Sequence, residues 1–303
     1  MTRRRLRIPI AVAALAGAAA VGLVLTGDRA GRPAGPHAAV GGLAPRDLTR
    51  ILSAADAIAA DRPRVALVAE GRRLFRSNAL ARAGESCQSC HLEGGGTNAE
   101  LGTILHPQEE GDFRGPRDVP SLWGVADTPP YGWAGREDEL DAFVAGTIES
   151  HFVDGETQPT ATTAEQIAAI TAYLETLAPP VTGFDQGVLS PAARRGEELF
   201  QGKAGCMACH AGLLLTDNGL HDTRVPKVAS GDTDRGVATS GPLAGAFNTP
   251  QLRDLRNTAP YMHNGSLATL RDVVEFYDRD ASVAPLRLTD PEIEDLVAYL
   301  ESL

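Results

Sequence analysis

The chain has 303 residues, of which 43% are hydrophobic and 5% are aromatic, and its formal net charge is −11. That length and composition allow about two domains of ordinary size, each with a packed core. The acidic balance argues against nucleic acid as a partner and against binding to anionic lipid surfaces. A basic or neutral protein partner is compatible with this charge.

The N-terminal segment has the form of an export signal. Arg3 to Arg7 form a basic cluster, and residues 8–25 form an apolar run. No clean small-residue cleavage motif follows, and the run is nearly long enough to cross a bilayer, so a retained membrane anchor is the alternative. Residues 27–42 are rich in Gly, Ala and Pro and resemble a tether. We predict that residues 1–43 direct the chain to the periplasm or to the outer face of the cytoplasmic membrane.

The pattern C-x-x-C-H occurs twice and uses all four cysteines of the chain. Its members are Cys87, Cys90 and His91 in the first copy, and Cys206, Cys209 and His210 in the second. Two thiols three positions apart reach the two vinyl groups of one haem, and the adjacent histidine becomes the proximal iron ligand. The alternative, a pair of thioredoxin-like dithiols, gives the two histidines no role. The sequence therefore predicts two covalently bound haem c groups.

The two halves of the chain repeat one another. Three short motifs recur: 71–75 with 196–200, 119–122 with 249–252, and 128–131 with 258–261. The last two pairs are separated by the same interval along the chain. Such self-similarity indicates a duplicated structural unit.

Each half also ends in a similar amphipathic helix. Thr163 and Thr289 each begin a capping box, and apolar residues follow at helical spacing in both segments. A Pro-containing linker lies near residues 178–180. We therefore predict a mainly α fold with two cytochrome c-like domains, 44–180 and 181–303, each carrying one haem.

With these motifs assembled, the chain resembles the bacterial dihaem cytochrome c peroxidase superfamily, and within it the MauG type. The most specific stretches are 248–255 and 258–266, and the resemblance covers about residues 65–303. It implies the fold stated above and a peroxidase or oxidase activity.

The resemblance also implies roles for individual residues. Tyr277 stands where MauG-type proteins have a tyrosine ligand to the C-terminal haem iron, and Trp133 matches a tryptophan between the two haems. A calcium ion between the domains would be held by the Asp118 side chain and by the backbone carbonyls of Thr258 and Pro260. The two haem histidines match those already named.

The pocket above the N-terminal haem departs from the family pattern. The family's acid, which assists cleavage of the peroxide O–O bond, falls on Val153, a family glutamine falls on Phe143, and a proline falls on Thr147. Asp154 and His151 are close enough in sequence to supply an acid or a ligand instead.

Met262 is the alternative to Tyr277 as the sixth ligand of the C-terminal haem. A phenolate oxygen would stabilise ferric and higher iron, whereas a thioether would favour ferrous iron. Methionine also fills gaps in protein cores, which is the non-functional interpretation of Met262.

These observations predict a MauG-like dihaem oxidoreductase that reacts with hydrogen peroxide at the N-terminal haem and exchanges electrons with a redox protein. Trp133 would share oxidising equivalents between the haems. The alternative is a non-enzymatic dihaem electron-transfer cytochrome, which the missing acid at Val153 favours and the tyrosine at 277 opposes. Modification of a protein partner is a third possibility.

Overall fold

The structure is a computed structural model, and it describes residues 62–80, 86–92, 103–107, 114–152, 162–227, 236–238, 241–279 and 285–303. The predicted export signal or membrane anchor therefore lies outside the described residues. Among the helices that are described, none combines the length and the apolar character needed to cross a bilayer. All described residues belong to one compact unit, Val40–Leu303.

Helices dominate the described part of the chain. The α-helices are α2 (Arg62–Arg76), α3 (Cys87–Cys90), α4 (Leu140–Phe152), α5 (Ala164–Leu174), α6 (Pro191–Gln201), α7 (Leu270–Arg279) and α8 (Asp290–Leu300). Short 3-10 helices are η1 (Asn78–Leu80), η3 (Val125–Asp127), η4 (Cys206–Ala208) and η5 (Leu255–Asn257). Two small antiparallel pairs complete the fold: β1 (Thr103–Pro107) with β2 (Arg114–Asp118), and β3 (Leu220–His221) with β4 (Phe247–Asn248).

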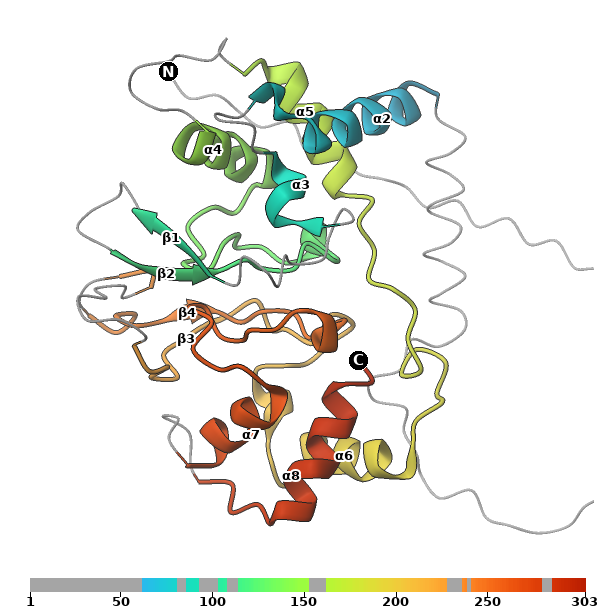
Figure 1. The fold of residues 1–303 in the computed structure, drawn as a ribbon, viewed down its shortest axis with the longest axis vertical. Helices are drawn as coiled ribbons and strands as arrows, with labels where there is room; N and C mark the ends of the chain where they lie inside the picture. The colour runs from blue at the N-terminus through green and yellow to red at the C-terminus, as the bar shows by residue number, and fades with distance from the viewer. Residues whose placement is uncertain are drawn as a thin grey trace, which may run out of the picture. The chain divides into compact units, whose positions relative to one another are not determined.

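Each half is built around one pair of crossing helices, α2 with α5 in the first half and α6 with α8 in the second (Figure 1). At each crossing, one helix has a glycine at its point of contact with the other helix. A β-carbon at Gly71 would lie 1.8 Å from the carbonyl oxygen of Ala169, and one at Gly196 would lie 1.9 Å from that of Asp295. Both helix pairs therefore pack backbone against backbone, which any larger residue would prevent.

The same aromatic contact stabilises both crossings. Phe75 meets Tyr173 edge-on with ring centroids 5.2 Å apart, and Phe200 meets Tyr299 in the same way at 5.2 Å. These residues belong to the two main cores of buried hydrophobic side chains. The predicted duplication and the mainly helical fold are confirmed.

The predicted capping boxes are also present. The Thr163 hydroxyl accepts a hydrogen bond from the Gln166 backbone N–H at 3.3 Å, while the Gln166 side chain accepts one from the Thr163 N–H at 2.9 Å. At α8 the Glu292 carboxylate accepts a hydrogen bond from the Thr289 N–H at 2.8 Å. These bonds satisfy backbone donors that the first turn leaves without intrahelical partners.

The loops of the two halves contact one another directly. The backbone N–H of Asp118 donates to the carbonyl of His263 at 2.9 Å, and that of Asn248 donates to the carbonyl of Trp133 at 2.9 Å. The Asn218 side chain adds a hydrogen bond to the carbonyl of Asp127. Residues that flank the recurring loop motifs therefore meet at this interface.

A buried ion pair fixes the segment between the halves to the second core. Arg253 and Asp185 have side chains only 3% and 2% exposed, with 2.5 Å between guanidinium and carboxylate. The guanidinium also donates to the carbonyl of Leu303 and lies over the ring of Phe184. Sequence patterns did not predict this cluster.

Candidate functional site

The first cysteine pair lies at the two ends of the short helix α3. Ser86 precedes this helix with a capping box, and the His91 backbone N–H donates to the carbonyl of Cys87 at 2.9 Å. Burial raises the pKa of the Cys87 thiol to about 11, so this thiol is neutral at physiological pH. The His91 ring lies 6.4 Å from that of Phe75, which connects the attachment loop to the α2–α5 crossing.

The second attachment loop has the same backbone connection, because the His210 N–H donates to the carbonyl of Cys206 at 2.9 Å. The Nδ1 atom of His210 lies 2.9 Å from the carbonyl oxygen of Leu215. A carbonyl can only accept, so Nδ1 carries the proton and Nε2 keeps the lone pair that an iron ligand needs. Desolvation lowers the pKa of His210, which also favours the neutral ring.

Leu215 holds this carbonyl in place through an unusual backbone conformation. Its φ angle is 56°, in the left-handed region, although its side chain is 4% exposed and packs in the second core. A bulky residue adopts this conformation at a cost of about 1 kcal/mol or more. The local fold therefore accepts strain that keeps an acceptor on the His210 ring.

Tyr277 faces the second attachment loop from α7. Burial raises the pKa of its hydroxyl to about 12, and the sulfur atoms of Cys209 and Cys206 raise it further, while a hydrogen bond with Thr223 acts in the opposite direction. Both Tyr277 and His210 are largely desolvated, yet each keeps part of its surface accessible. Side chains that line an internal cavity are desolvated in this way while part of their surface stays accessible. The His210 nitrogen and the Tyr277 oxygen are therefore donors that fit a haem at this site.

The equivalent side of the first half is different. The buried pair Leu140 and Val144 in α4 corresponds to Leu270 and Val274 in α7, at the interval that separates the repeated loop motifs. By that register, Thr147 occupies the position of Tyr277.

A second difference lies one turn earlier in α4. Phe143, which stands where the family has a glutamine, has its ring 6.0 Å from that of Tyr131. A β-carbon at Gly132 would lie 2.9 Å from the Phe143 ring. The first half therefore has an aromatic ring in place of a polar side chain at this position.

Trp133 is located where the two halves meet. Its indole N–H donates to the carbonyl of Asp118 at 2.8 Å, and its own carbonyl accepts from the Asn248 N–H. The indole ring meets the His263 ring edge-on at 6.5 Å. The proposed role between haems is therefore compatible with its position.

Asp118 is a buried acid close to the loop that contains Thr258 and Pro260. Its residue is 7% exposed, and burial raises the pKa of its carboxyl to about 8, although a hydrogen bond from the Val119 backbone N–H lowers it. Asp118 also contributes, after burial and Glu301, to a raised pKa of about 12 at Tyr261 in that loop. A buried carboxyl is a donor that suits Ca²⁺, whose charge would restore the ionised form.

The other predicted residues are less fully described. Met262 has a left-handed backbone with φ of 70°, at the position that Gly132 occupies in the first half with φ of 75°. His151 lies in the last turn of α4, but its side chain is outside the described part of the structure, as are Val153 and Asp154. Their proposed roles remain predictions.

Sequence reasoning missed a polar pair beside Cys209. The Nε2 atom of His221 lies 2.8 Å from a carboxylate oxygen of Asp217, and ligand atoms of His221, Asp217 and Cys209 all lie within 4.8 Å of one another. If Cys209 holds haem as a thioether, the histidine–carboxylate pair would remain as polar groups close to that attachment point. The spacing D-x-x-x-H was visible in the sequence, but only the β3 turn brings the two side chains together.

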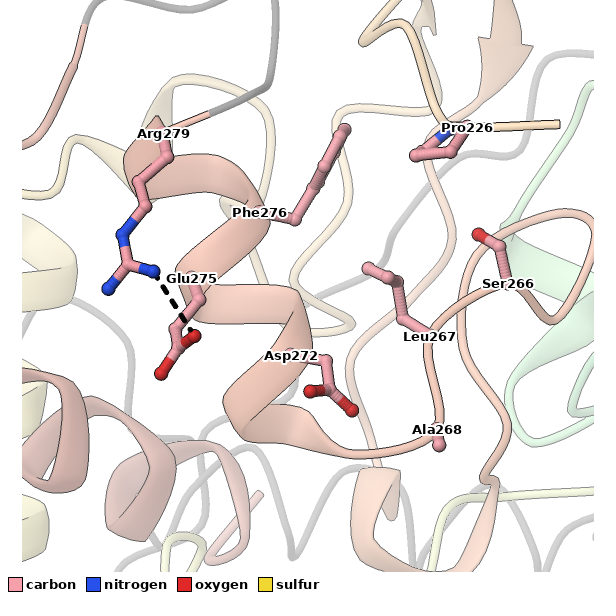
Figure 2. A pocket seen from close by; sticks show the side chains of 8 residues that line it. All are labelled: Pro226, Ser266, Leu267, Ala268, Asp272, Glu275, Phe276 and Arg279. Carbon is pink, nitrogen blue, oxygen red and sulfur yellow. Dashed lines mark hydrogen bonds and ion pairs between the residues drawn. The ribbon is translucent and has the colours of Figure 1, made fainter. Parts of the chain in front are cut away.

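A separate surface pocket of about 430 Å³ is lined by residues of α7, by residues 266–268 and by Pro226 (Figure 2). Its charged groups already interact with other groups of the protein. Glu275 binds Arg279 at 3.5 Å and Arg271 at 2.9 Å, and Asp272 accepts hydrogen bonds from Thr269 at the start of the helix. Because these groups already interact within the protein, we assign this pocket no function.

Comparison with protein families gives two matches. Residues 65–179 match the model for di-haem cytochrome c peroxidase, and residues 193–303 match the model for cytochrome c. Together they cover both halves of the duplicated chain.

Individual relatives extend this similarity over most of the chain. The cytochrome-c peroxidase IdrP1 of Denitromonas iodatirespirans is 30% identical over 99% of this chain and 93% of its own length. The methylamine utilization protein MauG of Methylorubrum extorquens is 30% identical over 78% of this chain and 77% of its own. A solved MauG-like protein associated with microbial copper homeostasis is 27% identical, with a TM-score of 0.66 over 78% of this chain and 88% of that one.

A further solved structure supports the fold alone. The diheme peroxidase BthA from Burkholderia thailandensis superposes with a TM-score of 0.63 and 24% identity, over 78% of this chain and 86% of that one. The peroxidase and MauG relatives favour an enzyme over the non-enzymatic carrier that the sequence left as the alternative.

Proposed function

Because this chain belongs to the di-haem cytochrome c peroxidase family and is an oxidoreductase with haem c cofactors, we propose that it reduces hydrogen peroxide at its N-terminal haem site. Electrons would come from a redox protein and pass through the C-terminal haem site. Two electrons and two protons convert one peroxide molecule into two water molecules. Haem supplies the redox chemistry when bound, while the protein determines its ligands, access and proton supply.

The observation that carries this proposal is the difference between positions 277 and 147. The Tyr277 hydroxyl is desolvated and its pKa is raised further by the sulfur atoms of Cys209 and Cys206, so its oxygen is our candidate for the sixth ligand of the C-terminal iron. Thr147 has the equivalent register in α4 and a side chain too short to play the same role. The C-terminal site is therefore proposed to be closed and to store an electron, and the N-terminal site to be open to peroxide.

Proton delivery at the open site must differ from the family pattern, because Val153 replaces the acid and the Phe143 ring replaces a polar side chain. We assign this role to Asp154 or His151, which lie beside Val153 in sequence. General acid–base groups contribute about 10²–10⁴-fold to rates. Asp154→Asn or His151→Gln should therefore slow the peroxide reaction without affecting cyanide binding to ferric protein.

Trp133 is proposed to carry oxidising equivalents between the two sites, since its side chain contacts both halves. Ca²⁺ bound by Asp118 and by the Thr258 and Pro260 carbonyls would hold the same two loops together.

We further propose that the protein is exported, either to the periplasm or to the outer face of the cytoplasmic membrane. That proposal is based on the basic and apolar segments at the N-terminus.

Electron paramagnetic resonance of the ferric holoprotein tests the division between the two sites. We expect one high-spin signal and one low-spin signal, and a rapid change in the high-spin signal on adding cyanide or peroxide. Thr147→Tyr should convert the high-spin signal to low-spin and suppress the peroxide reaction, whereas the isosteric control Thr147→Val should leave both unchanged. A wild-type protein that is wholly low-spin and inert to cyanide would contradict the proposal.

A further inference from the structure

The side chains around Trp133 form an ordered stack of rings. His263 lies flat against Phe247, with ring centroids 3.5 Å apart and an angle of 12° between the planes. Its ring meets the Trp133 indole at 6.5 Å and 68°. His263 is 7% exposed, so this contact is made inside the protein. Aromatic pairs with these geometries are favourable beyond the area that they bury.

Backbone hydrogen bonds link the same residues into a closed circuit. The Trp133 indole N–H donates to the Asp118 carbonyl at 2.8 Å, and the Asp118 N–H donates to the His263 carbonyl at 2.9 Å. Phe247, which supports the His263 ring, precedes Asn248, whose N–H donates to the Trp133 carbonyl at 2.9 Å. The indole can therefore shift only if β2, β4 and the loop around His263 shift with it.

Charge distinguishes the two ends of the stack. The Arg117 guanidinium lies 5.4 Å from the centre of the Phe247 ring. A cation is attracted to an aromatic ring through the negative face of that ring, and it opposes the loss of an electron there. An electron vacancy is therefore disfavoured at the Phe247 end and remains on the indole, which is the most easily oxidised of the three rings.

We propose that His263 is a positioning residue for Trp133, and this rests on the proposed function of Trp133 as the electron relay. Its flat ring, supported by Phe247, would fix the orientation of the indole and stabilise the indole after it has lost an electron. The electron balance is simple, because Trp133 would give one electron to the N-terminal site after hydrogen peroxide has oxidised that site, and would regain one from the C-terminal site. No bond to His263 forms or breaks.

The position of His263 in the sequence is consistent with this role. His263 and Trp133 occupy equivalent positions of the duplicated motif, one in each half of the chain. The interface therefore pairs one loop with its own counterpart, and each contributes a ring at the same point.

The test measures the rate at which the oxidised state spreads from one haem site to the other in the holoprotein after one equivalent of hydrogen peroxide is added, because only a peroxide-oxidised site can take an electron from the indole. Three variants are compared: His263→Leu, which removes the ring, His263→Phe, which keeps a flat ring, and Trp133→Phe. Trp123→Phe is the matched control, because Trp123 is the other tryptophan of the chain and packs in the first core instead. Thermal unfolding of each variant reports any effect on stability.

We expect His263→Leu to slow transfer about tenfold, because the oxidised indole loses a favourable ring contact. We expect His263→Phe to restore most of the rate, because it keeps a ring at this position. Trp123→Phe should transfer electrons at the wild-type rate. A purely structural role would lower the melting temperature in His263→Leu without changing the rate. If His263→Leu does not fold, Phe247→Leu tests the same support and should also slow transfer.

The outcomes separate the two proposals. Slow transfer in Trp133→Phe with normal transfer in both His263→Leu and Phe247→Leu overturns the positioning role and leaves the relay intact. Normal transfer in Trp133→Phe overturns the relay and the positioning role together. Equal slowing in His263→Leu and His263→Phe also overturns the proposal, because a ring at this position would then not be sufficient.

Discussion

Calcium binding should release a proton from Asp118. In the calcium-free protein, burial raises the pKa of this carboxyl to about 8, so it is mostly protonated at neutral pH. Ca²⁺ binds the ionised form, and binding near pH 6.5 should therefore release close to one proton per chain. The apparent affinity should increase about tenfold for each pH unit up to about pH 8, and should be constant above that.

The size of the effect follows from the shift in pKa. A change from the ordinary value of 3.8 to about 8 corresponds to a free-energy cost on the order of 5 kcal/mol for ionising Asp118 in the calcium-free fold. The pKa is higher in the folded protein than in the unfolded chain. The contribution of Asp118 to the unfolding free energy of the calcium-free protein is therefore fully present below about pH 4. It is lost as the pH rises to about 8.

Titration calorimetry in two buffers of different protonation enthalpy measures the released proton directly. Asp118→Asn should abolish calcium binding and remove this pH dependence from the unfolding free energy of the calcium-free protein. Asp127→Asn is the matched control, because Asp127 is an exposed acid in the same half and should change neither property. Calcium affinity that is constant from pH 5.5 to 7.5, or normal binding by Asp118→Asn, would refute the reasoning.

Three further predictions concern the haems and the buried ion pair. Intact mass should show two haems on the wild-type chain and a disrupted attachment in Cys90→Ala, and a wild-type mass with one haem would contradict the assignment. Tyr277→Met should raise the reduction potential of the C-terminal haem in a redox titration, because an anionic oxygen ligand is replaced by a thioether; an unchanged potential would point to another ligand, such as Met262. Arg253→Leu should destabilise the protein by about 3–5 kcal/mol in denaturant unfolding, since Asp185 is left buried without its cation. Exposed Arg256→Leu is the control, and similar losses in both variants would exclude the ion pair as the cause.

Much of the fold could be predicted from short motifs whose physical requirements are local. A capping box needs only residues three apart, so Thr163 and Thr289 marked two helices correctly. The recurring motifs that begin at Gly71 and Gly196 identified the helices of both crossings. The reason for those glycines, a carbonyl less than 2 Å from any β-carbon, depends on the partner helix and was not visible in the sequence.

The site was predicted less completely, because its contacts join distant segments through irregular backbone. His263 comes from a loop and Phe247 from the short strand β4, and no spacing rule indicates that their rings stack. Arg253 and Asp185 are likewise 68 residues apart, in segments without helical or strand periodicity. The role of Leu215 depends on one positive φ angle, which side-chain identity alone did not indicate.

The glycine crossings have a consequence for the energy of electron transfer. Where two helices touch through their backbones, no rotamer change at the contact can alter the spacing or the angle between them. Each attachment loop comes shortly after such a helix in the chain, after α2 and η1 in one half and after α6 in the other. Surroundings that move little when a charge appears or disappears make each transfer less costly, because little reorganisation is required. We therefore expect Gly71 and Gly196 to favour a low reorganisation energy for haem bound in either half.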